Sequence, residues 1–178
     1  MLLWLCYRYC IKIYIAQSID GYIAGPDGSV SHLEAFQDTD FGFDEFIESV
    51  DGIIMGRNTL DAFFEGHGWP YPEKLPAVIM THRLLPRGMP EQVRVSENID
   101  VAAELFPNSY VDGGHVIAQF LARSLIREAR IFTLPILLGA GIPLFPEGAA
   151  SENFWTLSES KSYSCGTVEN HYIIPAKT

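Results

Sequence analysis

The stretch 109–125, with the sequence SYVDGGHVIAQFLARSL, constrains the possible fold more than any other part of the chain. It starts with apolar residues typical of a strand, turns at Gly113 and Gly114, and continues with apolar residues at the spacing of one buried helix face. Two glycines leave no Cβ between the backbone and a ligand, and a helix N-terminus offers unpaired N–H groups to an anion. The stretch therefore predicts either a pyrophosphate-binding turn or a tight turn without a ligand, because a short glycine motif alone does not separate the two. For the first case, we expect a side chain at Gly114 to block the ligand more than it harms the fold.

The rest of the chain alternates between strand and helix patterns. Apolar runs predict strands at 11–16, 51–55, 76–81, 93–95 and 131–138. Apolar residues at helical spacing predict helices within 43–50, 60–64 and 101–106. Two runs, 155–163 and 167–174, flank a Ser-Cys-Gly turn and predict an antiparallel hairpin. This order predicts an α/β fold whose mixed, mostly parallel sheet is flanked by helices and closed by a C-terminal antiparallel hairpin.

Three local features carry more specific expectations. Pro135 lies inside the run 131–138, and we expect a bulge or an edge position there because proline has no N–H for a strand ladder. Residues 17–29 are rich in turn formers and predict a mobile surface loop. Asn58 or Thr59 is the expected N-cap of the helix that follows the second strand.

Length and composition limit the domains and partners. A chain of 178 residues with 48% hydrophobic and 19% charged residues predicts one domain, over 11–176, preceded by an N-terminal extension, 1–10. The net charge of −10 argues against nucleic acid and anionic membranes as partners. Cys6, Cys10 and Cys165 lack the spacing of metal ligands, so we expect no metal site and reduced thiols in a cytoplasmic protein.

Ligands of an α/β sheet gather at the carboxyl ends of its strands, and three polar segments directly follow predicted strands. They are 56–59, 81–83 and 112–115. The first two supply Arg57 and Arg83, and the third supplies the glycine turn. Two guanidinium groups beside helix N-termini in an acidic protein predict a site for a nucleotide with several phosphates. The chain has neither a Walker A sequence nor a complete Gly-x-Gly-x-x-Gly fingerprint, so no Walker-type or Rossmann-type site is predicted.

Five segments occur in an order that resembles one family. They are IAQSIDGYIAG, GIIMGRNT, VIMTHR, YVDGGHVIAQFL and LPILLGAGIPLF, and they cover most of residues 11–147. In these segments the chain resembles the dihydrofolate reductase-like superfamily, specifically the branch that includes the reductase domain of the bifunctional riboflavin-biosynthesis deaminase/reductase. The resemblance implies a three-layer fold, hydride transfer from NADPH and a homodimer.

The resemblance also implies roles for individual residues. The adenosine half and the 2′-phosphate of NADPH would contact Gly56, Arg57, Asn58, Thr59, Thr81, His82 and Arg83. The pyrophosphate would contact Asp112, Gly113, Gly114, His115 and Val116. Ala16 and Ile23 would border the nicotinamide, the loop 25–29 would cover it, and Thr133 and Pro135 would face the substrate. The family has a glycine triplet where this chain has Asp112 before its two glycines, which places a carboxylate near the phosphates unless its side chain points away.

The predicted activity is that of an NADPH-dependent reductase, which transfers a hydride to a small heterocyclic or imine/carbonyl substrate. Asp40 and Asp44 are the candidate proton donors, and the alternative for both is a surface acid that caps a helix. Two other functions stay open. One is 5-amino-6-(5-phosphoribosylamino)uracil reductase of riboflavin biosynthesis, and the other is a non-catalytic nucleotide-binding module. Hydride transfer to an activated acceptor separates the enzyme from the module.

Overall fold

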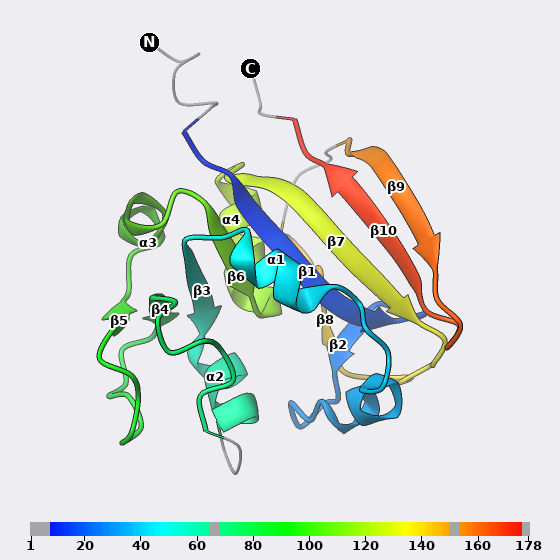
Figure 1. The fold of residues 1–178 in the computed structure, drawn as a ribbon, viewed down its shortest axis with the longest axis horizontal. Helices are drawn as coiled ribbons and strands as arrows, with labels where there is room; N and C mark the ends of the chain where they lie inside the picture. Colours follow the sequence, from blue (N-terminus) through cyan, green and yellow to red (C-terminus); the bar gives the residue numbers. More distant parts are fainter. Residues whose placement is uncertain (1–7, 65–67, 150–153, 176–178) are drawn as a thin grey trace.

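The computed structural model describes residues 8–64, 68–149 and 154–175 (Figure 1). Within these residues, the strands of the main sheet are β1 (Ile11–Ser18), β3 (Gly52–Gly56), β4 (Ala77–Met80), β5 (Val93–Ser96), β6 (Ser109–Asp112), β7 (Ile126–Leu134), β9 (Thr156–Ser162) and β10 (Val168–Ile173). Their order across the sheet is β5-β4-β3-β6-β1-β7-β10-β9. Two short strands, β2 (Tyr22–Ala24) and β8 (Ile142–Pro143), pair with each other in a second sheet. Of the predicted extension 1–10, residues 1–7 lie outside the described part.

The main sheet is mixed. The neighbouring strands from β5 to β7 pair in parallel. The C-terminal hairpin then adds two antiparallel pairs, β7 with β10 and β10 with β9. The turn of this hairpin is closed by hydrogen bonds from the N–H of Tyr163 to the carbonyl of Thr167 and from the N–H of Gly166 to the carbonyl of Tyr163. The predicted mixed sheet with a C-terminal antiparallel hairpin is confirmed.

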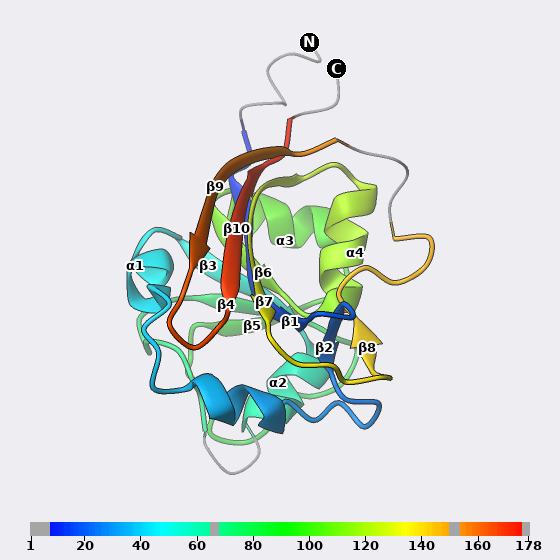
Figure 2. The ribbon, with the colours of Figure 1, turned by 90° about the vertical axis from the view of Figure 1, so that its right-hand side faces the viewer.

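Helices cover both faces of the sheet. α1 (Phe43–Glu48) and α2 (Arg57–Phe64) pack on one face, and α3 (Ile99–Leu105) and α4 (Gly114–Ala122) pack on the other. Side chains alternate along the central strands, so Ile53 and Met55 pack with α1 and α2 while Ile54 packs with α3 and α4. Figure 2 shows α1 on one side of the sheet and α3 and α4 on the other, which is the predicted three-layer arrangement. None of the helices in the described residues is long and apolar enough to cross a membrane.

Three local predictions differ from the structure. β7 begins at Ile126 and ends at Leu134, so Pro135 follows the strand, where its missing N–H breaks no ladder. The predicted loop 17–29 contains β2, a strand too short to show a pattern and held by its pairing with the distant β8. α2 starts at Arg57, directly after β3, so neither Asn58 nor Thr59 stands before the helix as its N-cap.

Candidate functional site

The carboxyl ends of the central parallel strands meet at one edge of the sheet. Gly56 at the end of β3 pairs with Met80 at the end of β4, and Met55 pairs with Asp112 at the end of β6. β1 leads to α1 on one face, whereas its neighbour β6 leads to α4 on the other face. Neighbouring strands whose connections leave toward opposite faces form the crevice in which open α/β sheets bind ligands. The fold therefore brings the three predicted polar segments to one edge.

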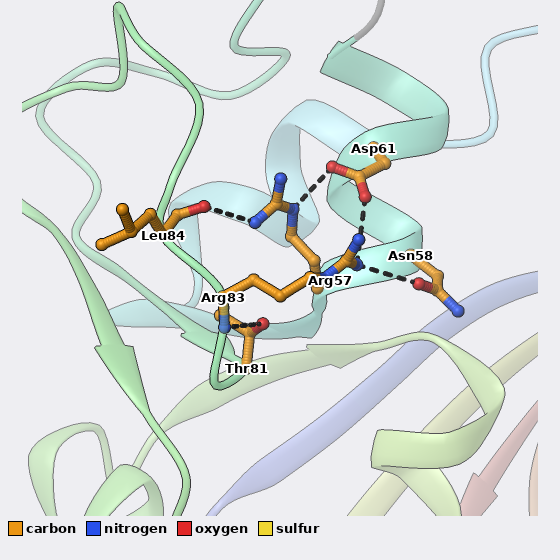
Figure 3. Close-up of polar contacts among 6 residues, drawn as sticks. All are labelled: Arg57, Asn58, Asp61, Thr81, Arg83 and Leu84. Carbon is orange, nitrogen blue, oxygen red and sulfur yellow. Dashed lines mark hydrogen bonds and ion pairs between the residues drawn. The ribbon is translucent and has the colours of Figure 1, made fainter.

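Arg57 and Arg83 converge on a third residue, Asp61 (Figure 3). The Arg57 Nε atom lies 2.6 Å from Asp61 Oδ1, and the Arg83 Nη2 atom lies 3.1 Å from Asp61 Oδ2. Arg83 Nη2 also donates to Asn58 Oδ1 at 3.2 Å, and Arg57 Nη1 donates to the carbonyl oxygen of Leu84. Asp61 lies one helical turn after Arg57 in α2, whereas Arg83 follows the neighbouring strand β4. Two guanidinium groups thus flank one carboxylate, and Arg57, Asp61 and Arg83 together form the arginine cluster.

The segment after β4 contributes unequally to this cluster. Thr81 is buried, and its Oγ1 accepts a hydrogen bond of 3.0 Å from the N–H of Arg83, which fixes the turn that carries the arginine. His82 faces solvent, with 83% of its side chain exposed and Nδ1 2.9 Å from Glu97 Oε1. Of the three residues predicted to bind cofactor here, Arg83 joins the arginine cluster, Thr81 supports it, and His82 pairs elsewhere.

The turn between β6 and α4 is closely packed on both sides. Gly113 has a φ of +91°, which favours glycine, and a Cβ there would collide with Thr59 Oγ1. Gly114 has no such φ, but a Cβ there would lie 2.9 Å from the carbonyl oxygen of Pro143 and 3.3 Å from Ile23 Cδ1. The packing of the fold itself therefore requires both glycines. The structure contradicts the part of the expectation that spares the fold, because a side chain at Gly114 must displace the backbone carbonyl of Pro143.

The first turn of α4 supplies backbone donors of the kind that bind anions. The N–H groups of Val116 and Ile117 donate to the carbonyl oxygen of Gly113 and close the first helical turn. The N–H groups of Gly114 and His115 have no acceptor among the hydrogen bonds of the described residues. Val116 is buried, whereas the side chain of His115 is exposed. Among the described residues, these two N–H groups thus have no partner and lie at the positive end of the helix dipole, that of Gly114 on a buried residue.

Asp112 is buried beneath the glycine turn. Its Oδ1 atom accepts a hydrogen bond of 2.7 Å from the N–H of Gly113, and the Tyr71 hydroxyl lies 3.5 Å from Oδ2. Burial raises the pKa of the Asp112 carboxyl from 3.8 to about 6, against the opposite effect of hydrogen bonds from Gly113, Tyr110 and Tyr71. The carboxylate faces these core tyrosines and occupies the Gly113 N–H, so that N–H is not free for a phosphate.

Ala16 and Ile23 lie on two elements that meet at this edge. Ala16 is half-buried near the end of β1, where it pairs with Phe132. Ile23 belongs to β2, and its Cδ1 lies beside Gly114, 3.3 Å from the point where a Cβ would stand. The loop 25–29 follows β2 and is closed by a backbone hydrogen bond of 2.8 Å between its first and last residues. β2 and the glycine turn are therefore neighbours.

Thr133 and Pro135 lie at the end of β7, beside the C-terminal hairpin. Thr133 pairs with Gln17 of β1 on one side and with Val168 of β10 on the other. Pro135 is exposed, and a Cβ on Gly166 in the hairpin turn would lie 3.2 Å from its ring. Since β7 and β6 flank β1, these two residues and the glycine turn lie on opposite sides of β1.

Asp40 and Asp44 are exposed acids at the start of α1. Asp40 Oδ1 accepts a hydrogen bond of 2.8 Å from the N–H of Gly42, the residue before the helix. Asp44 lies in the first turn of the helix, where a negative charge is favourable. Asp40 thus closes the turn before α1 and Asp44 adds a negative charge to its first turn, but no side chain in the described part of the chain caps this helix with a hydrogen bond, and neither residue joins the arginine cluster.

A buried ion pair between β7 and β10 was not predicted from the sequence. Glu169 is 4% exposed and accepts hydrogen bonds of 2.6 Å from Arg130 Nε and 2.6 Å from the Tyr163 hydroxyl. The Arg130 guanidinium also lies over the ring of Tyr14, 5.4 Å from its centroid. Burial raises the pKa of Tyr163, and Glu169 and Asp40 raise it further. Sequence reasoning missed the pair because its members lie 39 residues apart and each has the pattern of an ordinary strand residue.

Two further acids were missed. Asp61 stands four residues after Arg57 within a predicted helix, and this spacing of an ion pair was a usable signal. Asp20 accepts hydrogen bonds from the N–H groups of Leu138 at 3.2 Å and Gly139 at 2.7 Å, which tie the β1–β2 turn to the loop after β7. In the described residues, no three histidine, cysteine, aspartate or glutamate side chains are grouped so that they could hold a metal ion.

The fold and this edge define an α/β protein with a candidate nucleotide site at a switch point of its sheet. No protein-family model matches the chain. It is 30% identical over 175 residues to the uncharacterized protein YwjB of Bacillus subtilis (strain 168), across 90% of this chain and 95% of YwjB. It is 26% identical over 178 residues to the uncharacterized protein YyaP of the same organism, across 91% of this chain and 93% of YyaP.

Solved structures identify the fold. The crystal structure of a putative riboflavin biosynthesis protein from Shewanella sp. PV-4 matches with a TM-score of 0.82 and 34% identity, over 93% of this chain and 98% of that one. RibD of Acinetobacter baumannii matches with a TM-score of 0.72 and 17% identity, over 94% of this chain and 58% of that one, and shows the fold alone. The chain belongs to the dihydrofolate reductase-like superfamily, in the branch of the RibD reductase domain, as the five sequence segments predicted.

Proposed function

We propose that the protein is an NADPH-dependent reductase that transfers a hydride to a small heterocyclic or imine/carbonyl substrate. The observation that carries the proposal is the convergence of Arg57 and Arg83 at the edge where α4 presents the N–H groups of Gly114 and His115. Guanidinium groups and helix N-termini both bind phosphates, and here they occur together in a chain of net charge −10. When bound, NADPH supplies the hydride, and the protein supplies binding and orientation.

The 2′-phosphate and adenosine half are assigned to the ends of β3 and β4. Arg57 and Arg83 hold the 2′-phosphate, and Asn58 and Thr81 keep Arg83 in place through the hydrogen bonds described above. The remaining residues assigned to this half of the cofactor are Gly56 and Thr59, which adjoin the glycine turn, and His82 at the solvent side.

The pyrophosphate is assigned to the first turn of α4. The N–H groups of Gly114 and His115 are its donors, since Asp112 takes up the N–H of Gly113. Val116 is buried, and its Cγ2 lies 3.3 Å from the point where a Cβ on Gly56, the last residue of β3, would stand. The first turn of α4 therefore packs closely against the end of β3, from which α2 starts.

The nicotinamide and substrate are assigned to the two sides of β1. Ala16 and Ile23 border the nicotinamide, and Thr133 and Pro135 face the substrate across β1. Asp40 and Asp44, both beside the start of α1, are the two candidate proton donors. Replacement of a true donor, as in Asp40→Asn, lowers turnover and alters its pH profile while cofactor binding stays unchanged.

The proposal is tested by cofactor binding followed by turnover. NADPH is titrated by calorimetry, and oxidation of the bound nicotinamide is then followed with pterin, pyrimidine and quinone acceptors. We expect binding and turnover with at least one acceptor class. Failure to bind either NADPH or NADH would overturn the proposal. Tight binding without turnover across the panel would favour the non-catalytic nucleotide-binding module.

A second candidate function is the reduction of 5-amino-6-(5-phosphoribosylamino)uracil. It is favoured by the similarity, at 34% identity over nearly the whole chain, to a protein described as a putative riboflavin biosynthesis protein. The ribosylated pyrimidine and the free heterocycle are compared as acceptors with NADPH as donor. A marked preference for the ribosylated pyrimidine supports this activity, and equal or no turnover rejects it.

We also propose that the protein is a cytoplasmic homodimer. Within the predicted apolar run, the side chains of Ile131 and Leu134 are buried in the subunit, so the run itself offers little surface. Leu137 is 72% exposed and Phe145 is 44% exposed, and both lie in the segment that follows β7, where a second subunit would cover them. Light scattering at micromolar concentration distinguishes a dimer from a stable monomer of 19.9 kDa, which would reject the proposal.

A further inference from the structure

Asp61 is shared between the two arginines of the proposed phosphate site. One of its carboxylate oxygens pairs with Arg57 and the other with Arg83. Its side chain is 30% exposed, compared with 16% for Arg57 and 55% for Arg83, so the three charges lie at the surface but are not fully solvated. An anion that enters the cluster meets two positive charges and one negative charge.

We infer that Asp61 limits the preference of this site for a 2′-phosphorylated dinucleotide over an unphosphorylated one, an inference that rests on the proposed NADPH site. A 2′-phosphate that contacts both guanidinium groups is also brought near the Asp61 carboxylate, and the two negative charges repel each other. The 2′-hydroxyl of NADH carries no charge and can donate a hydrogen bond to a carboxylate. Asp61 therefore weakens the binding of NADPH and does not weaken that of NADH.

The direction of the effect depends on whether the arginines keep their places without the Asp61 charge. Each has a second partner: Arg57 Nη1 donates to the carbonyl oxygen of Leu84, and Arg83 Nη2 donates to Asn58 Oδ1. An asparagine at position 61 also keeps the shape of the side chain and one acceptor oxygen. The loss of repulsion between residue 61 and the 2′-phosphate then outweighs any loss in the orientation of the two arginines.

The test compares wild type with Asp61→Asn by calorimetric titration of NADPH and NADH at low salt. We expect NADPH to bind about two- to fivefold more tightly to the variant, as for a partly exposed charge interaction, and NADH to bind equally or more weakly. This gain in affinity for NADPH should shrink as salt is added, because salt screens the charges. Adenosine 2′,5′-bisphosphate and adenosine 5′-monophosphate, which lack the nicotinamide half, should reproduce the difference. Asp100→Asn is the matched control, because Asp100 also pairs with an arginine, Arg123, at 3.3 Å but near the far end of α4.

The outcomes separate this inference from the proposed function. A wild-type protein that binds neither dinucleotide overturns both. A wild type that binds NADPH, with an Asp61→Asn variant whose preference for NADPH is unchanged or lower, overturns only the role of Asp61. Asn58→Asp is the reciprocal variant and needs no change at Asp61. By adding a carboxylate beside Arg83, it should lower the affinity for NADPH more than that for NADH, and equal effects on both would overturn the inference.

Discussion

The Oδ1 atom of Asp112 accepts a hydrogen bond of 2.7 Å from the backbone N–H of Gly113, the next residue in the chain. Asp112 is buried at the end of β6, with the Tyr71 hydroxyl 3.5 Å from its other carboxylate oxygen. The contact joins a titratable group to the turn from which α4 starts. The protonation of Asp112 therefore bears on the stability of the fold at the proposed pyrophosphate site.

The stability of the protein should depend on pH through Asp112. Burial raises the pKa of this carboxyl to about 6 in the folded state from an ordinary value of 3.8, so folding favours its protonated form. The cost of burying the charge is fully present above a pH of about 6 and is lost as the pH falls toward about 4. This cost corresponds to roughly 3 kcal/mol.

Asp112→Asn removes this charge and keeps an acceptor for the N–H of Gly113. We expect the variant to be more stable than wild type at neutral pH, and the difference to shrink as the pH falls from about 6 to about 4. Urea denaturation of both proteins across this range measures the difference. A difference that does not vary with pH would contradict the assignment to Asp112.

The sequence predicted those parts of the fold that depend on local patterns. β6, its glycine turn and α4 follow from apolar periodicity and two glycines within 17 residues, and they were placed correctly. The start of β7 was missed because this part of the strand carries charged residues such as Arg130, whose partner Glu169 lies on the distant β10. β2 was missed because its pairing partner β8 is equally remote in sequence. Pairing between distant segments leaves no local pattern.

The candidate site likewise has features that the sequence predicted and features that it did not. Arg57, Arg83 and the glycine turn follow strands directly, so the general rule for sheet edges was enough to place them together. The shared ion pairs of Asp61 depend on the direction of three side chains, which the sequence does not fix. The inward direction of Asp112 likewise depends on two tyrosines from other parts of the chain.

Glu169 should contribute more to stability than a typical surface acid. Its buried carboxylate neutralises Arg130 and accepts a hydrogen bond from Tyr163. Glu169→Gln leaves the partly buried guanidinium of Arg130 without a counter-charge, and we expect a loss of about 2–4 kcal/mol in the free energy of unfolding. Chemical denaturation measures it, with Glu159→Gln on the fully exposed β9 as the control. Similar small losses for both variants would show that the ion pair is not a major stabilising contact.

Arg57→Ala should weaken NADPH binding by roughly ten- to a hundredfold, because a hydrogen bond to a charged group contributes on the order of 1.5–3 kcal/mol. Binding of NADH should change much less, since NADH has no 2′-phosphate. Calorimetric titration of both cofactors measures the two changes. Arg123→Ala, near the C-terminus of α4, is the control for the loss of one positive charge. Equal losses for NADPH and NADH in Arg57→Ala would rule out a role at the 2′-phosphate.

Gly113→Ala and Gly114→Ala should destabilise the protein through different contacts, so a second substitution, Thr59→Ala, should partly rescue only the first. Gly113→Ala introduces a collision with Thr59 Oγ1 and places alanine at a positive φ, so we expect a loss of about 2–4 kcal/mol from overpacking and backbone strain together. Thr59→Ala removes the Oγ1 atom, so the double variant should regain the part due to overpacking and keep the strain of about 1 kcal/mol. Gly114→Ala collides instead with the backbone carbonyl of Pro143, which Thr59→Ala does not move.

Thermal and urea denaturation of the single and double variants test this assignment. A coupling energy of about 1 kcal/mol or more between positions 59 and 113, and none between 59 and 114, is the expected result. No coupling at either pair would mean that the turn adjusts away from Thr59, and the contact between the starts of α2 and α4 would then not be rigid. Coupling at 113 alone would show that the two helix N-termini are held against each other before any ligand binds, as a preformed phosphate site requires.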